Sequence, residues 1–196
     1  MSSKEKEFYN ACEKNDLEKV KELSNQINDI NWGNPDRSDY TGLHISCLLG
    51  NKEIVEYLIS HPKINLNKEN KYGWTPLFIA CWKGKEEIVK ILLKDERVNV
   101  NKEDKFGQTP LYCSCENGKE EIVKILFASG REIDTTKKTI PGNRDWNNTT
   151  AAEIARKKGK EQIADLVDEY AEKPMEIILR LRKEMSKYLL IVQIYS

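Results

Sequence analysis

The sequence TPLFIACWKGKEEIVKILL, at residues 75–93, predicts two short helices joined by a tight turn. The Thr75 hydroxyl can accept a backbone N–H of the first helical turn, and Pro76 suits the next position because it has no N–H to leave unpaired. Gly84 permits the turn that ends the first helix. A second helix begins near Glu86, with apolar residues at helical spacing along one side. The unit is therefore a helix, a turn and a helix, and an extended segment and a further turn follow it at residues 98–107.

The same unit recurs with a period of 34 residues. Three features keep this register: a Thr-x-Leu start, a glycine after the first helix, and a Glu-Ile-Val run in the second helix. They begin at Thr41, Thr75 and Thr109, at Gly50, Gly84 and Gly118, and at Glu53, Glu87 and Glu121. A further start at Thr150 is displaced by 41 residues, which indicates seven inserted residues, and a weaker copy spans Phe8 to Leu23. A fixed period of this length predicts a solenoid, because one unit cannot bury its apolar side alone and stacked copies can.

The unit resembles the ankyrin repeat, whose signature Thr-Pro-Leu-His-x-Ala is nearly met at residues 75–80. The resemblance covers roughly residues 5 to 171. Three departures stand out: among the copies only His44 keeps the signature histidine, Gly42 replaces the helix proline, and Asp39 replaces the turn glycine. These departures put the side-chain hydrogen bonding of the signature histidine in question outside the second copy.

We therefore expect an all-α fold, an ankyrin-repeat solenoid of stacked helix-turn-helix units with projecting β-turn or hairpin loops. The expected array spans residues 1–171, and a C-terminal tail spans residues 172–196. The five repeats are expected near residues 5–38, 39–72, 73–106, 107–147 and 148–171, with helix pairs near 5–24, 41–60, 75–95, 109–129 and 150–171. Terminal repeats are expected to be atypical, since one of their faces meets water.

The five cysteines do not suggest a metal site or a disulfide. Four of them, Cys12, Cys47, Cys81 and Cys115, occupy the same position in successive repeats. Such positions lie about 8–10 Å apart, whereas a disulfide needs Cα atoms within about 7 Å and zinc thiolates must meet at about 2.3 Å from one point. We expect a column of buried, free thiols, and we expect Cys113 to face elsewhere and to be partly exposed.

No constellation of residues suggests catalysis. Only two histidines occur, and one of them, His44, lies inside the structural signature. The dipeptides Gly84-Lys85, Gly118-Lys119 and Gly159-Lys160 echo a phosphate-binding loop, but they lack its earlier glycine and its Ser or Thr. The basic cluster at residues 156–160 is interpreted as a solvated helix end, with contact to an acidic partner or a nuclear signal as the alternatives. We expect no enzyme activity, no catalytic residue, no metal and no cofactor.

Composition indicates an elongated protein, and the first residues of the chain indicate an intracellular one. Hydrophobic residues make up 39% and charged residues 33%, which suits an elongated array with much surface per residue. Positive and negative residues cancel at 32 each, so no broad attraction to nucleic acid or to a membrane is expected. The polar start at residues 1–7 has no apolar core of a secretory signal. We expect a monomer in the cytoplasm, with the nucleus as the alternative location.

The tail has two parts with different character. Residues 175–187 have helical character, with Ile178, Leu181 and Met185 along one side, and we expect this helix to pack on the final repeat. Residues 188–195 are almost wholly apolar. This run covers the open end of the stack, binds a partner, or is the cut end of a longer segment, and we favour the first interpretation.

The resemblance implies a non-catalytic module, an adaptor or scaffold, that binds an unidentified protein through its turn tips and inner first-helix face. The alternative is a regulatory, inhibitory or targeting subunit that holds an enzyme. Aligning the repeats gives candidate partner-binding residues that are not expected to be needed for stacking. On the turns these are Tyr40, Lys71, Tyr72, Trp74, Lys105, Phe106 and Gln108, and at the first-helix ends they are Leu48, Trp82, Lys83, Glu116 and Asn117. The aromatic members are expected at the centre, since aromatic residues are frequent interface anchors.

Overall fold

The computed structural model describes residues 4–141 and 148–195, with side chains described as far as residue 186 and nothing described from 142 to 147. The apolar run at residues 188–195 thus lies outside the described side chains. Part of the connection between the fourth and fifth helix pairs, at residues 130–149, also lies outside the described residues.

Eleven α-helices and one short 3-10 helix make up the described fold. The helix pairs are α1 (Lys4–Glu13) with α2 (Leu17–Ser24), α3 (Gly42–Leu49) with α4 (Lys52–Ser60), α5 (Pro76–Lys83) with α6 (Glu86–Leu93), α7 (Pro110–Glu116) with α8 (Glu120–Ala128), and α9 (Ala151–Lys157) with α10 (Glu161–Glu172). The 3-10 helix η1 (Pro35–Arg37) lies between α2 and α3, and α11 (Pro174–Tyr195) follows α10. The five pairs confirm the expected helix positions to within a few residues.

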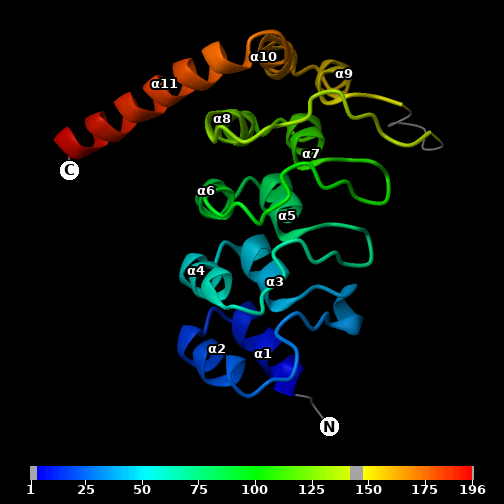
Figure 1. Ribbon diagram of the computed structural model, residues 1–196, viewed down its shortest axis with the longest axis vertical. Coiled ribbons are helices and arrows are strands. Elements are labelled where there is room, and N and C mark those ends of the chain that lie inside the picture. Colours follow the sequence, from blue (N-terminus) through cyan, green and yellow to red (C-terminus); the bar gives the residue numbers. More distant parts are fainter. Residues whose placement is uncertain (1–3, 142–147, 196) are drawn as a thin grey trace.

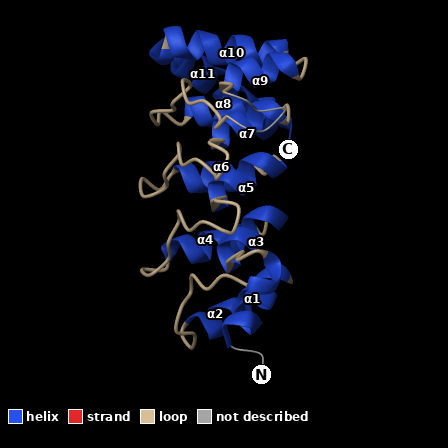
Figure 2. Cartoon of the chain, turned by 90° about the vertical axis from the view of Figure 1, so that its right-hand side faces the viewer, coloured by secondary structure: helices blue, strands red, loops and turns tan. Residues whose placement is uncertain are grey.

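The pairs stack into an elongated solenoid (Figure 1). The first helices α1, α3, α5, α7 and α9 form one column, the second helices form the other, and the connecting loops project beyond the first-helix column (Figure 1). Within the part of the chain described, the backbone forms no strand, only an isolated bridge between Asn34 and Tyr40. Figure 2 shows the stack from the side of the loops and gives the same picture of helices joined by loops. The expected all-α solenoid is confirmed.

Local signals in the sequence begin and end these helices as expected. Thr75 caps α5 by accepting the backbone N–H of Phe78 at 3.2 Å, and Pro76 occupies the first helical position. Gly84 ends the helix with φ of +68°, in the left-handed region that glycine adopts without strain. Asp39, which stands where the later turns have glycine, adopts the same region with φ of +59°.

The core lies between successive pairs. The middle first helices α3, α5 and α7 are enclosed by other first helices on both sides, so that most of their residues are buried. The core residues Leu77, Ala80, Cys81, Val89 and Leu92 each have at most 1% of their surface exposed. Burial of this kind is the main favourable term in folding, at about 25 cal/mol per Å² of apolar surface.

All five cysteines are free and buried, which confirms the column of thiols. The expectation for Cys113 was wrong, because only 2% of its surface is exposed. The equivalent residues of the preceding repeats, Ile45 and Ile79, are buried as well, since this position faces the neighbouring first helix. Isoleucine at both equivalents was the sequence signal that marked the position as core.

Asparagine side chains tie each repeat to the next through backbone groups. The Asn67 amide donates to the carbonyl of Arg97 at 2.7 Å and accepts the N–H of Asn99 at 2.7 Å. Asn31 and Asn101 make the equivalent pair of bonds to the loops that follow them, at 2.7–2.9 Å. We call these three residues the asparagine ladder. Each member satisfies two loop groups that would otherwise depend on water.

The turn tips are also joined to one another. Backbone N–H groups of Lys71, Lys105 and Ile140 donate to the carbonyls of Ser38, Tyr72 and Phe106, at 2.9–3.1 Å. Within each turn a short polar side chain holds the loop, as Asp104 does by accepting the N–H groups of Phe106 and Gln108 at 2.8 and 2.9 Å. The loops therefore form a continuous, hydrogen-bonded edge along the array.

The recurring Gly-Lys pairs have a structural role. Lys85, Lys119 and Lys160 fold over the glycine of the preceding repeat, so that a Cβ added at Gly84 would lie 3.3 Å from the Lys119 side chain. The ammonium groups thereby lie near the carboxyl ends of the first helices, where positive charge is favourable. These pairs are a stacking device, in agreement with the rejection of a phosphate-binding loop.

The tail helix α11 packs against α8 and α10 through Ile177, Ile178 and Leu181, with Met185 partly buried. Arg182 donates to the carbonyls of Ala128 and Ser129, at 2.8 and 3.2 Å, at the end of α8. The helix thus contacts the final repeat, as expected, but it also spans the repeat before it (Figure 1).

The described part of the tail does not cover the open end of the stack, because it lies along the second helices. The final repeat closes that end with charge: Arg156 pairs with Asp165 and Asp168 of α10. A polar outer face on a terminal repeat keeps a solenoid soluble and ends the stacking. Among the described helices, none combines the length and apolar character needed to cross a lipid bilayer.

Candidate protein-binding surface

The candidate surface is centred on four rings at the turns and first helix of the third repeat. Tyr72 and Phe106 lie at successive turn tips, each with 43% of its surface exposed. Trp74 precedes α5 and Trp82 lies near its end, and both are partly buried. We call Tyr72, Trp74, Trp82 and Phe106 the aromatic surface.

Trp74 contacts three neighbouring rings. The Trp74 centroid lies 4.8 Å from that of Tyr72 and 5.2 Å from that of Trp82. Trp74 also stacks on Phe78, at 5.7 Å and an interplanar angle of 9°. The Lys83 ammonium lies 3.7 Å from the centroid of Trp82, which is a cation–π geometry. Mutual contact fixes the ring positions, so this apolar patch is preorganised for binding.

A pocket of about 390 Å³ lies beside the two tryptophans, between α5 and α7. Its apolar wall consists of Trp74, Phe78 and Trp82, and its other wall carries Gln108, Cys113, Glu116 and Asn117, with Lys158 from the end of α9. We call it the α5–α7 pocket. The eight residues that line it come from the third, fourth and fifth repeats, and stacking of these repeats brings them together.

Trp74 has a second, structural role. Its indole Nε1 donates to Oδ2 of Asp104 at 3.1 Å, across the boundary between two turns. Burial of Asp104 raises the pKa of its carboxyl above 3.8, while the bonds from Gln108, Phe106 and Trp74 act in the opposite direction. The expectation that this position is not needed for stacking was therefore wrong for Trp74.

Other candidate residues divide into two groups. Lys71 and Lys105 are exposed at the turn tips, and Glu116 and Asn117 line the α5–α7 pocket, together with the buried Gln108. Tyr40 and Leu48 instead pack partly against the core. For these two residues and for Gln108, burial contradicts the expectation that they are dispensable for stacking.

Ile140 was missed by the sequence reasoning. It continues the series Tyr72 and Phe106 at the same 34-residue spacing, hydrogen-bonds through its backbone to Phe106, and has 57% of its surface exposed. Because Ile140 keeps the 34-residue spacing, the seven residues inserted before Thr150 must follow Ile140 in the chain. The repeated spacing was the signal that could have found it.

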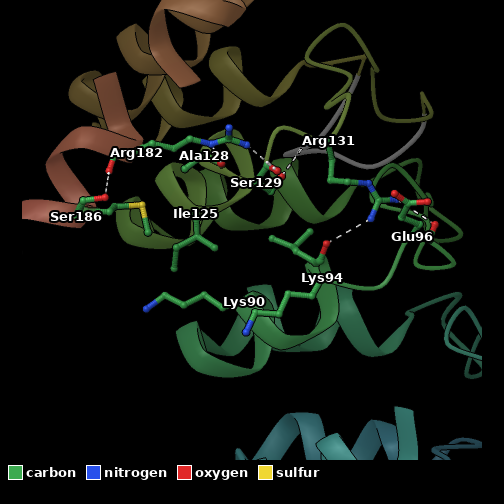
Figure 3. Close-up of a pocket in the computed structure, with 11 residues that line it drawn as sticks. Lys90, Lys94, Glu96, Ile125, Ala128, Ser129, Arg131, Arg182 and Ser186 are labelled. Atoms are coloured by element: carbon green, nitrogen blue, oxygen red, sulfur yellow. Dashed lines mark hydrogen bonds between the residues drawn. The ribbon is translucent and has the colours of Figure 1, made fainter. Parts of the chain in front are cut away.

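A groove larger than the α5–α7 pocket lies elsewhere and was also missed. It measures about 590 Å³ and lies between α6, α8 and α11, with Lys90 and Lys94 on the α6 side and Arg182 and Ser186 on the α11 side (Figure 3). Its arginines are already used by the fold: Arg182 caps α8, and Arg131 donates to four carbonyls at and after the end of α6, including those of Asp95 and Val98. The groove is a product of the docking of α11, which no repeat spacing reveals.

A comparison with protein-family models matches ankyrin repeats, in three copies, over residues 8–104 and 94–176. The chain belongs to the ankyrin repeat family. A comparison with curated proteins found no significant match.

Ankyrin repeats are generally protein–protein interaction modules and are typically non-catalytic. The thiol of Cys12 and the ring of His44 are both buried in this ankyrin array. Burial raises the pKa of the Cys12 thiol to about 12, so the reactive thiolate is disfavoured. Burial lowers the pKa of His44 to about 4, and its ring is used by Thr41 and by the carbonyl of Trp74. Among the described residues, no cluster of three or more His, Cys, Asp or Glu side chains is arranged to hold a metal ion.

Proposed function

We propose that this ankyrin array is a non-catalytic adaptor or scaffold that binds a protein partner through the aromatic surface and the adjoining α5–α7 pocket. The observation that carries the proposal is the set of contacting rings at Tyr72, Trp74 and Trp82, with Phe106 at the next turn tip; Tyr72 and Phe106 each have 43% of their surface exposed. Exposed aromatic groups beside a preformed pocket are typical anchors of protein interfaces.

Trp82 is set apart from the core that stacks the repeats. Trp82 contacts another ring and the Lys83 ammonium, and it makes no hydrogen bond among the described residues. By contrast, Leu92 is fully buried. Loss of Trp82 should therefore affect the scaffold less than loss of Trp74, which bonds to Asp104, and because Trp82 also lines the α5–α7 pocket it is a suitable probe of binding.

The test is affinity capture from cells that produce the chain, with the native protein, Trp82→Ala and Leu179→Ala as baits. Leu179 is a matched control, because it is an apolar residue with 62% of its surface exposed, on α11 far along the chain from the aromatic surface. We expect a partner that both the native chain and Leu179→Ala retain and that Trp82→Ala loses. By calorimetry with that partner, Trp82→Ala should weaken binding by about 2 kcal/mol or more.

Urea unfolding is the companion measurement. Trp82→Ala should lower the free energy of unfolding by less than Leu92→Ala, which removes core atoms and should cost about 2–5 kcal/mol. Partner affinity unchanged in Trp82→Ala would refute the proposed surface, and so would unfolding of that variant.

We also propose that the chain acts as a monomer inside the cell, in the cytoplasm or the nucleus. Five free thiols fit a reducing compartment, where disulfides are rare. Light scattering of the purified chain tests the oligomeric state, and microscopy of a fluorescent fusion tests the location.

A further inference from the structure

Gln108 contributes an unusual amide group to the α5–α7 pocket. Only 7% of its surface is exposed, and its side chain lines the pocket. Its backbone N–H and carbonyl bond to Asp104, at 2.9 and 3.0 Å. Its side-chain Nε2 is buried and has no hydrogen-bond partner among the described residues. A buried donor of this kind costs about 1–3 kcal/mol when it is unpaired, so an acceptor supplied by a ligand would be bound favourably.

The signature position explains why this amide lacks a partner. In the second repeat, His44 bonds to the carbonyl of Trp74 at 3.0 Å, and in the fourth, the Tyr112 hydroxyl bonds to Thr149 at 2.9 Å. The equivalent residue of the third repeat is Phe78, whose ring has no polar atom. The third repeat thus replaces a polar link to the next repeat with the apolar wall of the pocket.

Positive charge surrounds this pocket although the chain as a whole is neutral, with 32 residues of each sign. Lys158 lines the pocket, Lys83 lies over Trp82, and Lys105 lies at the adjacent turn tip. All three are exposed, and none forms an ion pair within the described part of the chain. The pocket wall itself carries one carboxylate, that of Glu116. An anionic ligand is therefore favoured over a cationic one.

We propose that the α5–α7 pocket binds an acidic peptide segment of the partner protein, with an aromatic or large aliphatic anchor. The anchor packs on Trp74 and Trp82, and a neighbouring Asp or Glu of the peptide pairs with Lys158 and accepts from Nε2 of Gln108. The last torsion of a glutamine is broad, so the amide turns toward the acceptor at small cost. This inference rests on the proposed function, since it names the chemistry of the partner at the same surface.

The first experiment is selection of a library of short random peptides on the full chain and, in parallel, on Trp82→Ala. We expect the peptides that the native chain recovers and Trp82→Ala loses to combine an aromatic or large aliphatic residue with adjacent Asp or Glu. Peptides that depend on Trp82 but carry no acidic residue would overturn this inference and leave the proposed function intact. If no recovered peptide depends on Trp82, the proposed surface itself fails.

The second experiment measures the affinity of the best synthetic peptide by fluorescence anisotropy. Lys158→Glu should weaken binding about ten-fold or more, whereas Lys157→Glu, the same charge change one residue away and outside the pocket lining, should have a smaller effect. Equal effects of Lys158→Glu and Lys157→Glu would overturn the proposed contact, and so would displacement of the peptide by a short single-stranded RNA at equal concentration.

Discussion

The hydrogen bond between Trp74 and Asp104 allows a quantitative prediction for the variant Trp74→Phe. The substitution keeps a ring in the cluster and removes the indole N–H that donates to Oδ2 of Asp104 at 3.1 Å. Hydrogen bonds to charged groups contribute about 1.5–3 kcal/mol. Because only 7% of the Asp104 surface is exposed, water cannot fully replace the lost donor, and we expect a loss of stability in this range.

Trp32→Phe is the matched control for this variant. It removes the same atoms from a partly buried tryptophan that packs against the core, and the Trp32 indole makes no hydrogen bond among the described residues. The difference between the two variants in free energy of unfolding therefore isolates the hydrogen bond. The measurement is urea-induced unfolding followed by circular dichroism.

The pH dependence provides an independent check. Burial raises the pKa of Asp104 in the folded state above its ordinary value of 3.8, so the folded chain holds the proton more tightly than the unfolded chain. At pH values between the pKa of Asp104 in the unfolded chain and its raised pKa in the folded chain, the contribution of Asp104 to the free energy of unfolding increases as the pH falls. The stability gap between Trp74→Phe and the native chain should be largest near neutral pH, where the carboxylate is charged, and should narrow as the pH falls through the raised pKa. Equal losses in Trp74→Phe and Trp32→Phe, or a gap that does not change with pH, would refute the reasoning.

Four further predictions concern the scaffold. Burial lowers the pKa of His44 from 6.5 to about 4, so the free energy of unfolding should fall by about 3 kcal/mol as the pH drops from 6.5 to 4. His44→Phe places at this position the residue that the third repeat has, and it should abolish this pH dependence in thermal melts. Asn67→Ala should cost about 1–3 kcal/mol in urea unfolding, since it removes two hydrogen bonds. All five thiols should react with a thiol reagent only after unfolding, and fast reaction of any thiol in the native chain would contradict the buried column. Deletion of residues 175–196 should lower the melting temperature, because it removes the buried residues Ile177, Ile178 and Leu181; an unchanged melting temperature would mean that α11 adds no stability.

The elements that could be predicted from the sequence are those that repeat. Thr75, Gly84 and the Glu-Ile-Val run recur in the same environment in successive units, so their spacing alone defines the helices and the core. The same comparison held enough information to place Cys113, beside Ile45 and Ile79, and Ile140, beyond Phe106. Extending the 34-residue spacing to these two positions would have predicted the burial of Cys113 and the place of Ile140 in the turn series.

The features that could not be predicted arise once in the chain. The contact of Arg182 with the end of α8 joins residues more than fifty positions apart, and no second copy of it exists for comparison. The α5–α7 pocket depends on how three repeats stack, and Gln108 was expected at a turn without any sign that its amide would be buried. Contacts between side chains of different repeats depend on how the repeats stack, and the spacing of residues in the sequence does not specify that geometry.

The asparagine ladder has a consequence for how such an array can grow. Asn31, Asn67 and Asn101 each bond to main-chain atoms of the next unit, and main-chain atoms are the same whatever side chains that unit carries. A duplicated block of 34 residues, spliced in frame between two middle units, would find a matching donor and acceptor at both of its boundaries. The gene for such a protein can therefore lengthen or shorten by recombination while the fold stays intact, and each new unit is free to acquire its own exposed side chains.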